Sequence, residues 1–423
     1  MTTVLAFVAL LLLVGAGVHI AIALGLVATA LLSFNLNIPP ILIAQMAWDS
    51  IDKYALVAIP FFIFAGNLMS RGNLALILLE LMGCLLRWFR GGVALTIATS
   101  SVFFAAINGS SVACAAAMGP AAVKLLPPEG YPPRFAAATV AVCSTLGLMI
   151  PPSLTFILIG SIVGLPITDL FIAGIIPGLL SAVMLGAATV VISRRNGYGN
   201  TLQPADWRGF GRRLPKASGA LLMPVLIIAT IYLGLFTPTE VSALAAVYAI
   251  VLVLLVYRTA SLRDVWDTAR DSTMQTVMIY AVVIGSGLLT AVLTRLGLAR
   301  EITAFLIAWD IQPWQFLLAV NILMIVVGMF LDGVSMIVLL SPILFPIAIA
   351  LEIHPVHFAV IITALVEVAT LTPPVGLNLF VMSRIARLPV TEVMRGTLPF
   401  FGVQLFGLFL VNAFPFLSLA LLT

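Results

Sequence analysis

The sequence has few charged residues. Asp, Glu, Lys and Arg make up 9% of its 423 positions, whereas hydrophobic residues make up 62%. A soluble globular protein has about 25% charged and about 45–50% apolar residues. So small a polar fraction cannot cover the surface of a water-soluble globule. We therefore predict a polytopic membrane protein.

Cysteine and histidine are also scarce, with three residues of each. Cys84, Cys114 and Cys143 have no CxxC spacing, and we interpret them as small apolar side chains in or beside the membrane. His354 and His357 form an H-x-x-H pair without a third ligand nearby in the sequence. We interpret the pair as part of a short, solvated outside loop rather than as a transition-metal site.

Two functional motifs are missing as well. The sequence contains no G-x-x-x-x-G-K-[ST] motif to bind phosphate, which argues against ATP hydrolysis by this chain. It also lacks the basic and aromatic patch that nucleic acid would need. We therefore expect neither an ATPase nor a nucleic-acid-binding protein.

Long apolar runs are abundant. A helix needs about 20 apolar residues to cross the hydrocarbon core. The first run has no basic start and no small-residue cleavage site, so we predict a retained first span rather than a signal peptide. The candidate spans are Val4–Leu32, Ala55–Met69, Phe171–Ile192, Ala220–Leu235, Val241–Tyr257, Thr273–Leu293 and Phe400–Leu422.

Positive charge orients these runs. The segment 194–216 carries six Lys or Arg residues and one acid, Asp206, so the positive-inside rule places it in the cytoplasm. Following the runs in both directions places every Lys and Arg in the cytoplasm except Lys53, Arg295 and Arg300. On this path the N-terminus is cytoplasmic and the C-terminus is periplasmic.

This orientation requires two apolar segments to enter the membrane and return to the same side. The segment 91–125 opens from the cytoplasm, and the segment 313–351 opens from the outside. We therefore predict two re-entrant helical hairpins that are inverted relative to each other.

Each predicted hairpin carries a small polar turn that precedes a double proline. The turn Asn108–Ser111 begins 43 residues before Pro151, and the turn Asp332–Ser335 begins 41 residues before Pro373. A Gly-Leu-Ala-like motif precedes each turn at matching spacing, and a helix along the membrane surface is predicted after each motif, at 73–90 and 298–310. Such motifs are common in membrane proteins, but the shared order and spacing indicate inverted structural repeats.

The prolines interrupt two transmembrane helices. The predicted breaks are at Pro151, Pro152, Pro373 and Pro374. Carbonyl groups freed at such a break can bind a cation, and the half-helix that follows presents free N–H groups to an anion. Together with inverted repeats, interrupted helices are typical of secondary transporters, whose substrates bind near the midplane.

Oxygen-bearing residues at the turns and breaks are candidate sodium ligands, because hard cations prefer oxygen. For each Ser or Thr the alternative is a hydroxyl bonded to a carbonyl one turn back in its own helix. Candidate sodium site 1 comprises Asn108, Ser110, Ser111, Ser144, Thr145 and Gly147. Candidate sodium site 2 comprises Asp332, Gly333, Ser335, Thr370, Thr372 and Gly376.

The organic substrate is expected between these two sites. Asn378 lies at the start of a half-helix, where its amide can donate to a carboxylate, and Ser153 has the comparable place in the other half. With Ser111 and Ser335 they form the candidate substrate-binding set. Glu367 is a buried acid that we interpret as supporting the second break, because acids inside a membrane are rare and usually functional.

Several motifs resemble the large membrane subunit of the TRAP transporters, the tripartite ATP-independent periplasmic transporters. These motifs occur in the same order as in the family and extend over nearly the whole chain. The sequence departs from the usual family pattern near the proposed ion sites, for example at Asn108 and Ser144. The motifs are Ser110–Ala113, Leu146–Ser153, Phe236–Glu240, Gly328–Asp332 and Thr372–Phe380.

The resemblance implies sodium-driven import of an organic anion such as a C4-dicarboxylate, a keto acid or a sialic acid. It also implies an elevator mechanism, in which a transport domain slides against a scaffold in the bacterial inner membrane. The implied partners are a small four-helix membrane subunit and a periplasmic substrate-binding protein, both as separate chains. No organic cofactor is expected.

Two alternatives stay open from the sequence. A stand-alone anion and sodium symporter would share the inverted hairpins without needing a periplasmic protein. An intramembrane enzyme would need a nucleophile and a base in facing helices, and Glu367 and His19 are the candidates for these roles. We interpret the chain as a transporter and not as an enzyme.

The predicted fold is an all-α polytopic membrane protein of the elevator type, with two re-entrant hairpins and two broken helices. The predicted parts in chain order are an N-terminal scaffold span with an outside loop (1–53), a first repeat (54–193), a cytoplasmic loop with a scaffold hairpin (194–271), a second repeat (272–397) and a C-terminal span (398–423). The first repeat contains a surface helix (73–90), a hairpin (91–125) and a broken helix (133–164). The second repeat contains a surface helix (298–310), a hairpin (313–351) and a broken helix (357–385).

Overall fold

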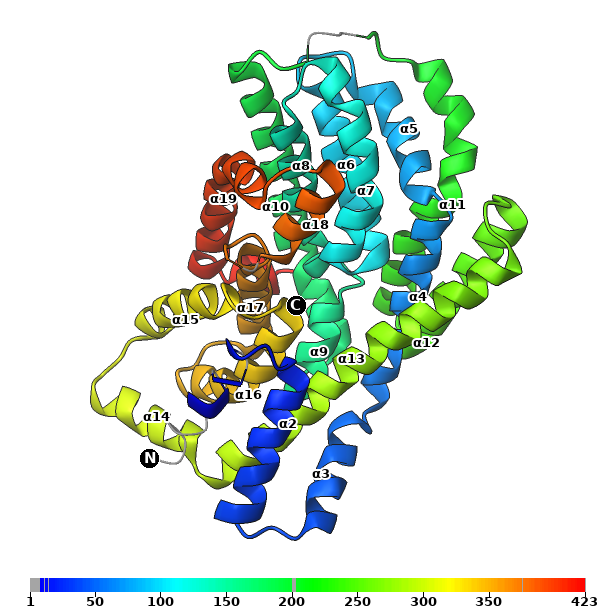
Figure 1. Cartoon of the computed structure of the whole chain (residues 1–423). Coiled ribbons are helices and arrows are strands. Elements are labelled where there is room, and N and C mark those ends of the chain that lie inside the picture. The colour runs from blue at the N-terminus through cyan, green and yellow to red at the C-terminus, as the bar shows by residue number, and fades with distance from the viewer. Residues whose placement is uncertain (1–7, 11, 14, 200–202, 375, 423) are drawn as a thin grey trace.

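The structure is a computed structural model that describes residues 8–10, 12–13, 15–199, 203–374 and 376–422. The described part is helical and contains no strand (Figure 1). Seven of its helices are long and apolar enough to cross a membrane. The prediction of an all-α polytopic membrane protein is therefore confirmed. These seven are Tyr54–Arg71, Ile167–Arg195, Trp207–Tyr232, Pro238–Val256, Leu262–Arg295, Gly333–Ala350 and Val390–Ala413.

Many of the helices are short, because turns and prolines interrupt the apolar runs. The α-helices are α2 (Ile20–Ala30), α3 (Pro40–Ile51), α4 (Ala58–Arg71), α5 (Leu74–Leu86), α6 (Gly92–Asn108), α7 (Ser111–Leu125), α8 (Pro133–Cys143), α9 (Leu154–Val163), α10 (Ile167–Arg195), α11 (Trp207–Tyr232), α12 (Pro238–Val251), α13 (Leu262–Arg295), α14 (Leu298–Ala308), α15 (Pro313–Gly328), α16 (Gly333–Ala350), α17 (Pro355–Ala369), α18 (Leu377–Ala386), α19 (Val390–Ala413) and α20 (Phe416–Leu419). Single-turn segments adjoin them at η1 (Leu31–Asn35), η2 (Tyr54–Val57), η3 (Pro127–Glu129), η4 (Ser144–Leu148) and η5 (Leu252–Val256).

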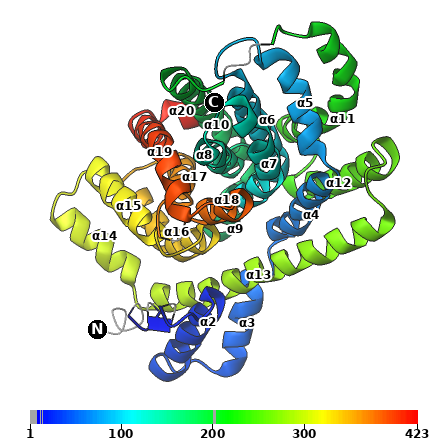
Figure 2. The same ribbon diagram turned by 45° about the horizontal axis from the view of Figure 1, so that its top comes forward.

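The longest helix, α13, has 34 residues and runs along one side of the molecule (Figures 1 and 2). It packs against α2, α3 and α4, and also against α16. The helices α7, α8, α17 and α18 gather on the other side of α13 from α2 and α3 (Figure 2). Pro151 and Pro152 are buried within this bundle, whereas Pro373 is partly exposed and Pro374 is exposed.

The core is deepest around α8 and α17. Every residue of α8 from Phe135 to Cys143 is buried, as is every residue of α17 from Val356 to Ala369. The run Ala136–Ala138 lets neighbouring helices approach α8 closely, as small residues do in membrane helices. The first halves of the two interrupted helices, α8 and α17, therefore lie where side chains are least accessible.

The first apolar run is not one continuous helix. The segment 16–19 is non-helical, and Nδ1 of His19 accepts a hydrogen bond from the backbone N–H of Ala21 at the start of α2 (3.4 Å). Gly17 has φ +84°, which ends the preceding helical turn. The predicted span Val4–Leu32 is therefore wrong as a single helix, and its residues 4–7 lie outside the described residues, as does the predicted cytoplasmic N-terminus.

Three predicted domain boundaries fall inside continuous helices. The boundary at 193/194 lies in α10, the one at 271/272 lies in α13, and the one at 397/398 lies in α19. Charged residues suggested loops at the first two positions, but both helices continue through them. For α13 the physical reason is a capping box, in which Ser261 and Asp264 exchange hydrogen bonds and start the helix before its charged turns.

The helix predicted along the surface at 73–90 ends earlier, at Leu86. Its residues Leu74, Leu78 and Leu81 are fully buried, and α5 packs against α6 and α11. The segment predicted at 298–310 forms α14, at the periphery of the molecule (Figure 1). The hairpins and broken helices have bounds within two residues of the predicted segments.

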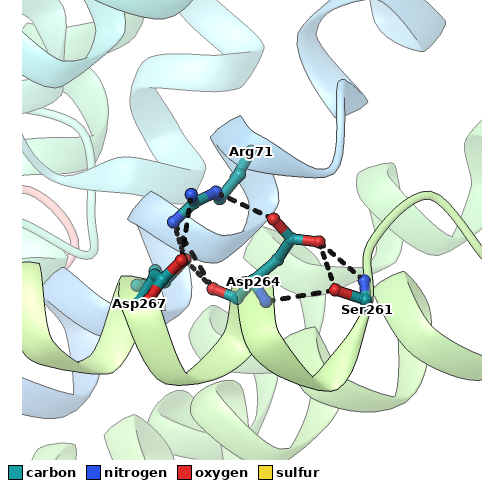
Figure 3. Close-up of polar contacts among 5 residues, drawn as sticks. Arg71, Ser261, Asp264 and Asp267 are labelled. Carbon is teal, nitrogen blue, oxygen red and sulfur yellow. Dashed lines mark hydrogen bonds and ion pairs between the residues drawn. The ribbon is translucent and has the colours of Figure 1, made fainter.

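An ion-pair network joins the end of α4 to the start of α13 (Figure 3). The Arg71 guanidinium lies 3.5 Å from Oδ1 of Asp264 and 3.7 Å from Oδ2 of Asp267, and it donates to Oγ1 of Thr268 at 3.3 Å. The same Asp264 carboxylate accepts from the backbone N–H and hydroxyl of Ser261. One carboxylate therefore both starts α13 and fixes it to α4.

We expect Arg71→Gln to lower thermal stability by less than about 1 kcal/mol, because these charges are partly exposed and screened by water. The loss should shrink as salt is added, since salt weakens exposed ion pairs. The measurement is the unfolding midpoint in detergent at low and high salt. Arg395→Gln is the matched control, because Arg395 pairs with Glu392 inside one helix (2.7 Å). A larger loss for the control would contradict a role in joining helices.

Candidate functional site

The first polar turn connects α6 to α7 in the interior. The helix α6 ends at Asn108, which is buried, and Gly109 follows in the left-handed region with φ +64°. The Ser110 hydroxyl then caps α7 by accepting from the backbone N–H of Ala113 (3.5 Å). The next residue, Ser111, is also buried. A buried helix start therefore lies at this turn.

The first turn lies directly against the first break. The backbone N–H of Leu154 donates to the Gly109 carbonyl (3.5 Å), and a Cβ added at Gly109 would lie 2.5 Å from the Pro152 carbonyl oxygen. A Cβ added at Gly147 would lie 3.4 Å from the Ser110 nitrogen. The structure thus brings together the residues of candidate sodium site 1 from the turn and from the break.

The first break consists of η4 and an irregular segment before α9. Ser144, Thr145 and Gly147 lie in η4, Pro151 and Pro152 follow it, and their peptide bond is cis. Ser153 caps α9 by accepting from the backbone N–H of Phe156 (3.3 Å), and its hydroxyl donates to the Leu148 carbonyl. Ser153 therefore serves the helix start in this state.

The second polar turn connects α15 to α16. Oδ2 of Asp332 accepts from the backbone N–H groups of Val334 (3.1 Å) and Ser335 (3.3 Å), and Oδ1 accepts from the Ser335 hydroxyl. Asp332 is thus the N-cap of α16. A Cβ added at Gly333 would lie 2.5 Å from Cγ1 of Val366, so this turn packs against α17.

The second break separates α17 from α18. The backbone N–H of Asn378 donates to the Thr370 carbonyl (3.3 Å), and that of Gly376 donates to the Thr372 carbonyl (3.1 Å). Pro373 and Pro374 lie between them, with a cis peptide bond, and Val375 lies outside the described residues. The break therefore keeps the two half-helices close to each other.

The hydroxyls at the breaks bond to their own helices, which is the alternative weighed from the sequence. The Ser144 hydroxyl donates to the Ala141 carbonyl (3.0 Å) and the Thr145 hydroxyl to the Val142 carbonyl (2.8 Å). The other pairs are Thr370 with the Glu367 carbonyl (2.8 Å) and Thr372 with the Val368 carbonyl (2.8 Å). A hydroxyl that donates its proton still has lone pairs for a cation.

Two amides from the second half of the chain reach the first break. The Asn378 side chain, on α18, donates to the Ala141 carbonyl (3.1 Å) and to the Ser144 hydroxyl (3.2 Å). The Gln404 side chain, on α19, donates to the Thr145 hydroxyl (2.8 Å). In contrast, the side chains of Asp332 and Ser335 form hydrogen bonds within their own turn. Asn378 therefore lies with site 1.

Sequence reasoning missed Gln404. It lies in the middle of an apolar C-terminal run, and a buried amide in such a run is the signal that would have identified it. Several buried polar atoms near the turns and breaks have no protein hydrogen-bond partner. They are Nδ2 of Asn108, Oδ1 of Asn378, Oε1 of Glu367 and Oε1 of Gln404. Unpaired buried groups of this kind are costly in an apolar interior and mark places where a ligand or water binds.

The two histidines near residue 355 are not both in a solvated loop. His354 precedes α17, but His357 lies in its first turn, is buried, and has Nδ1 3.1 Å from the Ser418 hydroxyl. The prediction failed because α17 begins at Pro355, a residue that suits the first turn of a helix. The helix carries His357 into the core.

The chain matches a family model described as "Tripartite ATP-independent periplasmic transporter, DctM component" over residues 5–417. It is 35% identical over 381 residues to the C4-dicarboxylate TRAP transporter large permease protein DctM of Pseudomonas aeruginosa, covering 90% of this chain and 88% of that protein. It is 31% identical over 406 residues to the sialic acid TRAP transporter large permease protein SiaM of Vibrio cholerae, covering 96% and 95%.

A solved structure is also similar. The YdaH transporter of Alcanivorax borkumensis superposes with a TM-score of 0.65 at 16% identity, covering 87% of this chain and 86% of that chain. This likeness shows the fold alone. With its seven candidate spans, the fold is that of a multi-pass membrane protein. The chain belongs to the family of DctM components, the large permease subunits of TRAP transporters, which confirms the resemblance carried by its motifs.

We expect Gly109→Ala to destabilise the protein by more than about 1 kcal/mol, because alanine is strained at φ +64° and its Cβ would overlap the Pro152 carbonyl. Gly164→Ala separates backbone strain from the overlap of the added Cβ. Gly164 also has a positive φ, +83°, but no atom lies within 4 Å of a Cβ added there, so this variant should show the strain alone. Gly402→Ala, with open space in a helix, should be neutral. The measurement is the unfolding midpoint of each variant in detergent, which should fall most for Gly109→Ala, less for Gly164→Ala and not at all for Gly402→Ala. Equal losses of stability in Gly109→Ala and Gly164→Ala would mean that the turn does not touch the break.

Proposed function

We propose that the chain is the permease of a sodium-driven importer of organic anions. The observation that carries this proposal is the contact of the first polar turn with the first break, around the Gly109 and Pro152 carbonyls. Oxygen atoms from two separated segments gather there, as a hard cation requires. A sodium ion that binds there would be a co-transported substrate.

The second turn and break support a second sodium position. Asp332 supplies a carboxylate beside α17, and Thr370, Thr372 and Gly376 surround the break. Of these groups only Asp332 carries charge, and two backbone N–H groups already bind it. The hydroxyls of Thr370 and Thr372 therefore matter more as ligands than the sequence alone suggested.

The organic anion would bind between the half-helices. Four buried or partly buried helix starts, at α7, α9, α16 and α18, follow the turns and breaks. Helix N-termini favour anions through their free N–H groups and the helix dipole. Asn378, whose Oδ1 is unpaired, and the hydroxyls of Ser111, Ser153 and Ser335 are the side chains we assign to the substrate.

The names of two relatives support a substrate class. One is named for C4-dicarboxylates and the other for sialic acid, and both substrates are carboxylates. We propose a carboxylate here, and we assign its selection to a periplasmic substrate-binding protein. The remaining part of the tripartite system would be a small membrane subunit of four helices on a separate chain.

The proposed mechanism is an elevator. In it the two hairpins, α6 with α7 and α15 with α16, move together with the broken helices. The N-terminal helices α2 and α3 and the hairpin of α11 and α12 form the scaffold, and α4 and α13 pack against them. The matched order of hairpin and broken helix supports two repeats of inverted orientation. The basic segments around Arg194 and Arg208 support a cytoplasmic location for that side, with the C-terminus in the periplasm.

We expect Thr372→Val to raise the sodium concentration for half-maximal uptake by roughly tenfold, because it removes one oxygen ligand without changing the volume. The measurement is substrate uptake into liposomes that contain the complete transporter, at a series of sodium concentrations. Thr363→Val is the matched control. Thr363 lies on α17, is buried as Thr372 is, and its hydroxyl likewise donates to a carbonyl of its own helix, that of Ala359 (2.9 Å). An unchanged sodium dependence in Thr372→Val would remove this residue from the site.

We expect the turns to change their accessible side during transport. Single cysteines at Ser111 and Ser335, in a protein whose three native cysteines are replaced, should react with membrane-impermeant reagents from opposite sides as sodium and substrate are varied. Both serines are buried in this structure, so labelling should depend on conformation. Labelling from a single side in every condition would contradict the elevator.

A further inference from the structure

A small internal cavity lies beside the second break. Its volume is about 10 Å³, and it is lined by α10, α17 and α19 together with Met149. Glu367, Gln404 and Ser181 are the lining residues with oxygen-bearing side chains, and the others are apolar or methionine. A space of this size holds about one water molecule when polar groups surround it.

Two hydrogen-bond acceptors face this cavity. Glu367 is 4% exposed and Gln404 is 7% exposed, and Oε1 of each has no protein partner. The orientation of the Gln404 amide follows from its neighbour: the Thr145 hydroxyl donates to the Val142 carbonyl, so it can only accept from Gln404. The amide nitrogen therefore lies at Thr145, and the amide oxygen is left for the cavity.

The chemistry of the lining selects the occupant. Two acceptors in one small space need a donor with two hydrogens, and water is such a donor. Sodium would need more oxygen ligands than these three side chains supply. No salt bridge to Glu367 is present among the described residues. The two unpaired oxygens, Oε1 of Glu367 and Oε1 of Gln404, are therefore the groups that an occupant must satisfy.

We propose that one water molecule donates to Oε1 of Glu367 and to Oε1 of Gln404, and that this chain of hydrogen bonds positions Thr145 at the first break. Gln404 is then a positioning residue that joins the two breaks. The Asn378 amide makes a parallel link to Ser144, one residue away in η4. This role in setting site 1 rests on the proposed sodium coupling.

The test keeps the proposed function and the positioning role apart. If uptake by the wild type does not depend on sodium, the proposed function fails. If it does depend on sodium and Gln404→Leu leaves that dependence unchanged, the positioning role alone is overturned.

The positioning part is tested at Gln404. Gln404→Leu should raise the half-saturating sodium concentration about tenfold, with the maximal rate and the unfolding midpoint nearly unchanged. Asn412→Leu is the matched control on α19, because its amide bonds only within its own helix, to the Leu408 carbonyl (2.8 Å). Adding Thr145→Val to Gln404→Leu should cause little further change, since the two residues act together. Additive effects, or an unchanged sodium dependence in Gln404→Leu, would overturn the role.

Discussion

The structure depends on satisfying backbone and side-chain polar groups where helices stop inside an apolar interior. In hydrocarbon an unpaired N–H or C=O costs several kcal/mol, so each interruption needs nearby partners. At the first break the partner comes from the turn, where Gly109 accepts from Leu154. At the second break Thr370 and Thr372 accept from residues beyond the prolines. Closing these contacts brings the hairpins against the broken helices, which builds the site.

The same requirement explains why two amides cross between the halves of the chain. Asn378 and Gln404 donate to consecutive residues, Ser144 and Thr145, and so attach α18 and α19 to the first break. The first break therefore takes contacts from both halves of the chain. Oδ1 of Asn378 and Oε1 of Gln404 have no protein partner, so each amide keeps an unpaired acceptor beside this break.

Much of the candidate site was predictable because breaks leave local signals. The small polar turns, the double prolines and the spacing between them located α6 with α7, α15 with α16 and the interruptions of two further helices. Boundaries set by charge were less accurate, as at residue 271, since a capping box let α13 begin earlier. The early break before α2 and the burial of His357 depend on single turns that hydrophobicity does not reveal.

The sequence by itself determined that this protein is a helical membrane protein of the TRAP permease family with interrupted helices, because composition, motifs and proline positions are local properties. Only the tertiary structure decided which segments meet. It placed the turn at Gly109 against Pro152, Asn378 beside Ser144, and Gln404 between Thr145 and the cavity of Glu367. Those pairings join residues far apart in the chain, and the packing of the whole helical bundle selects them.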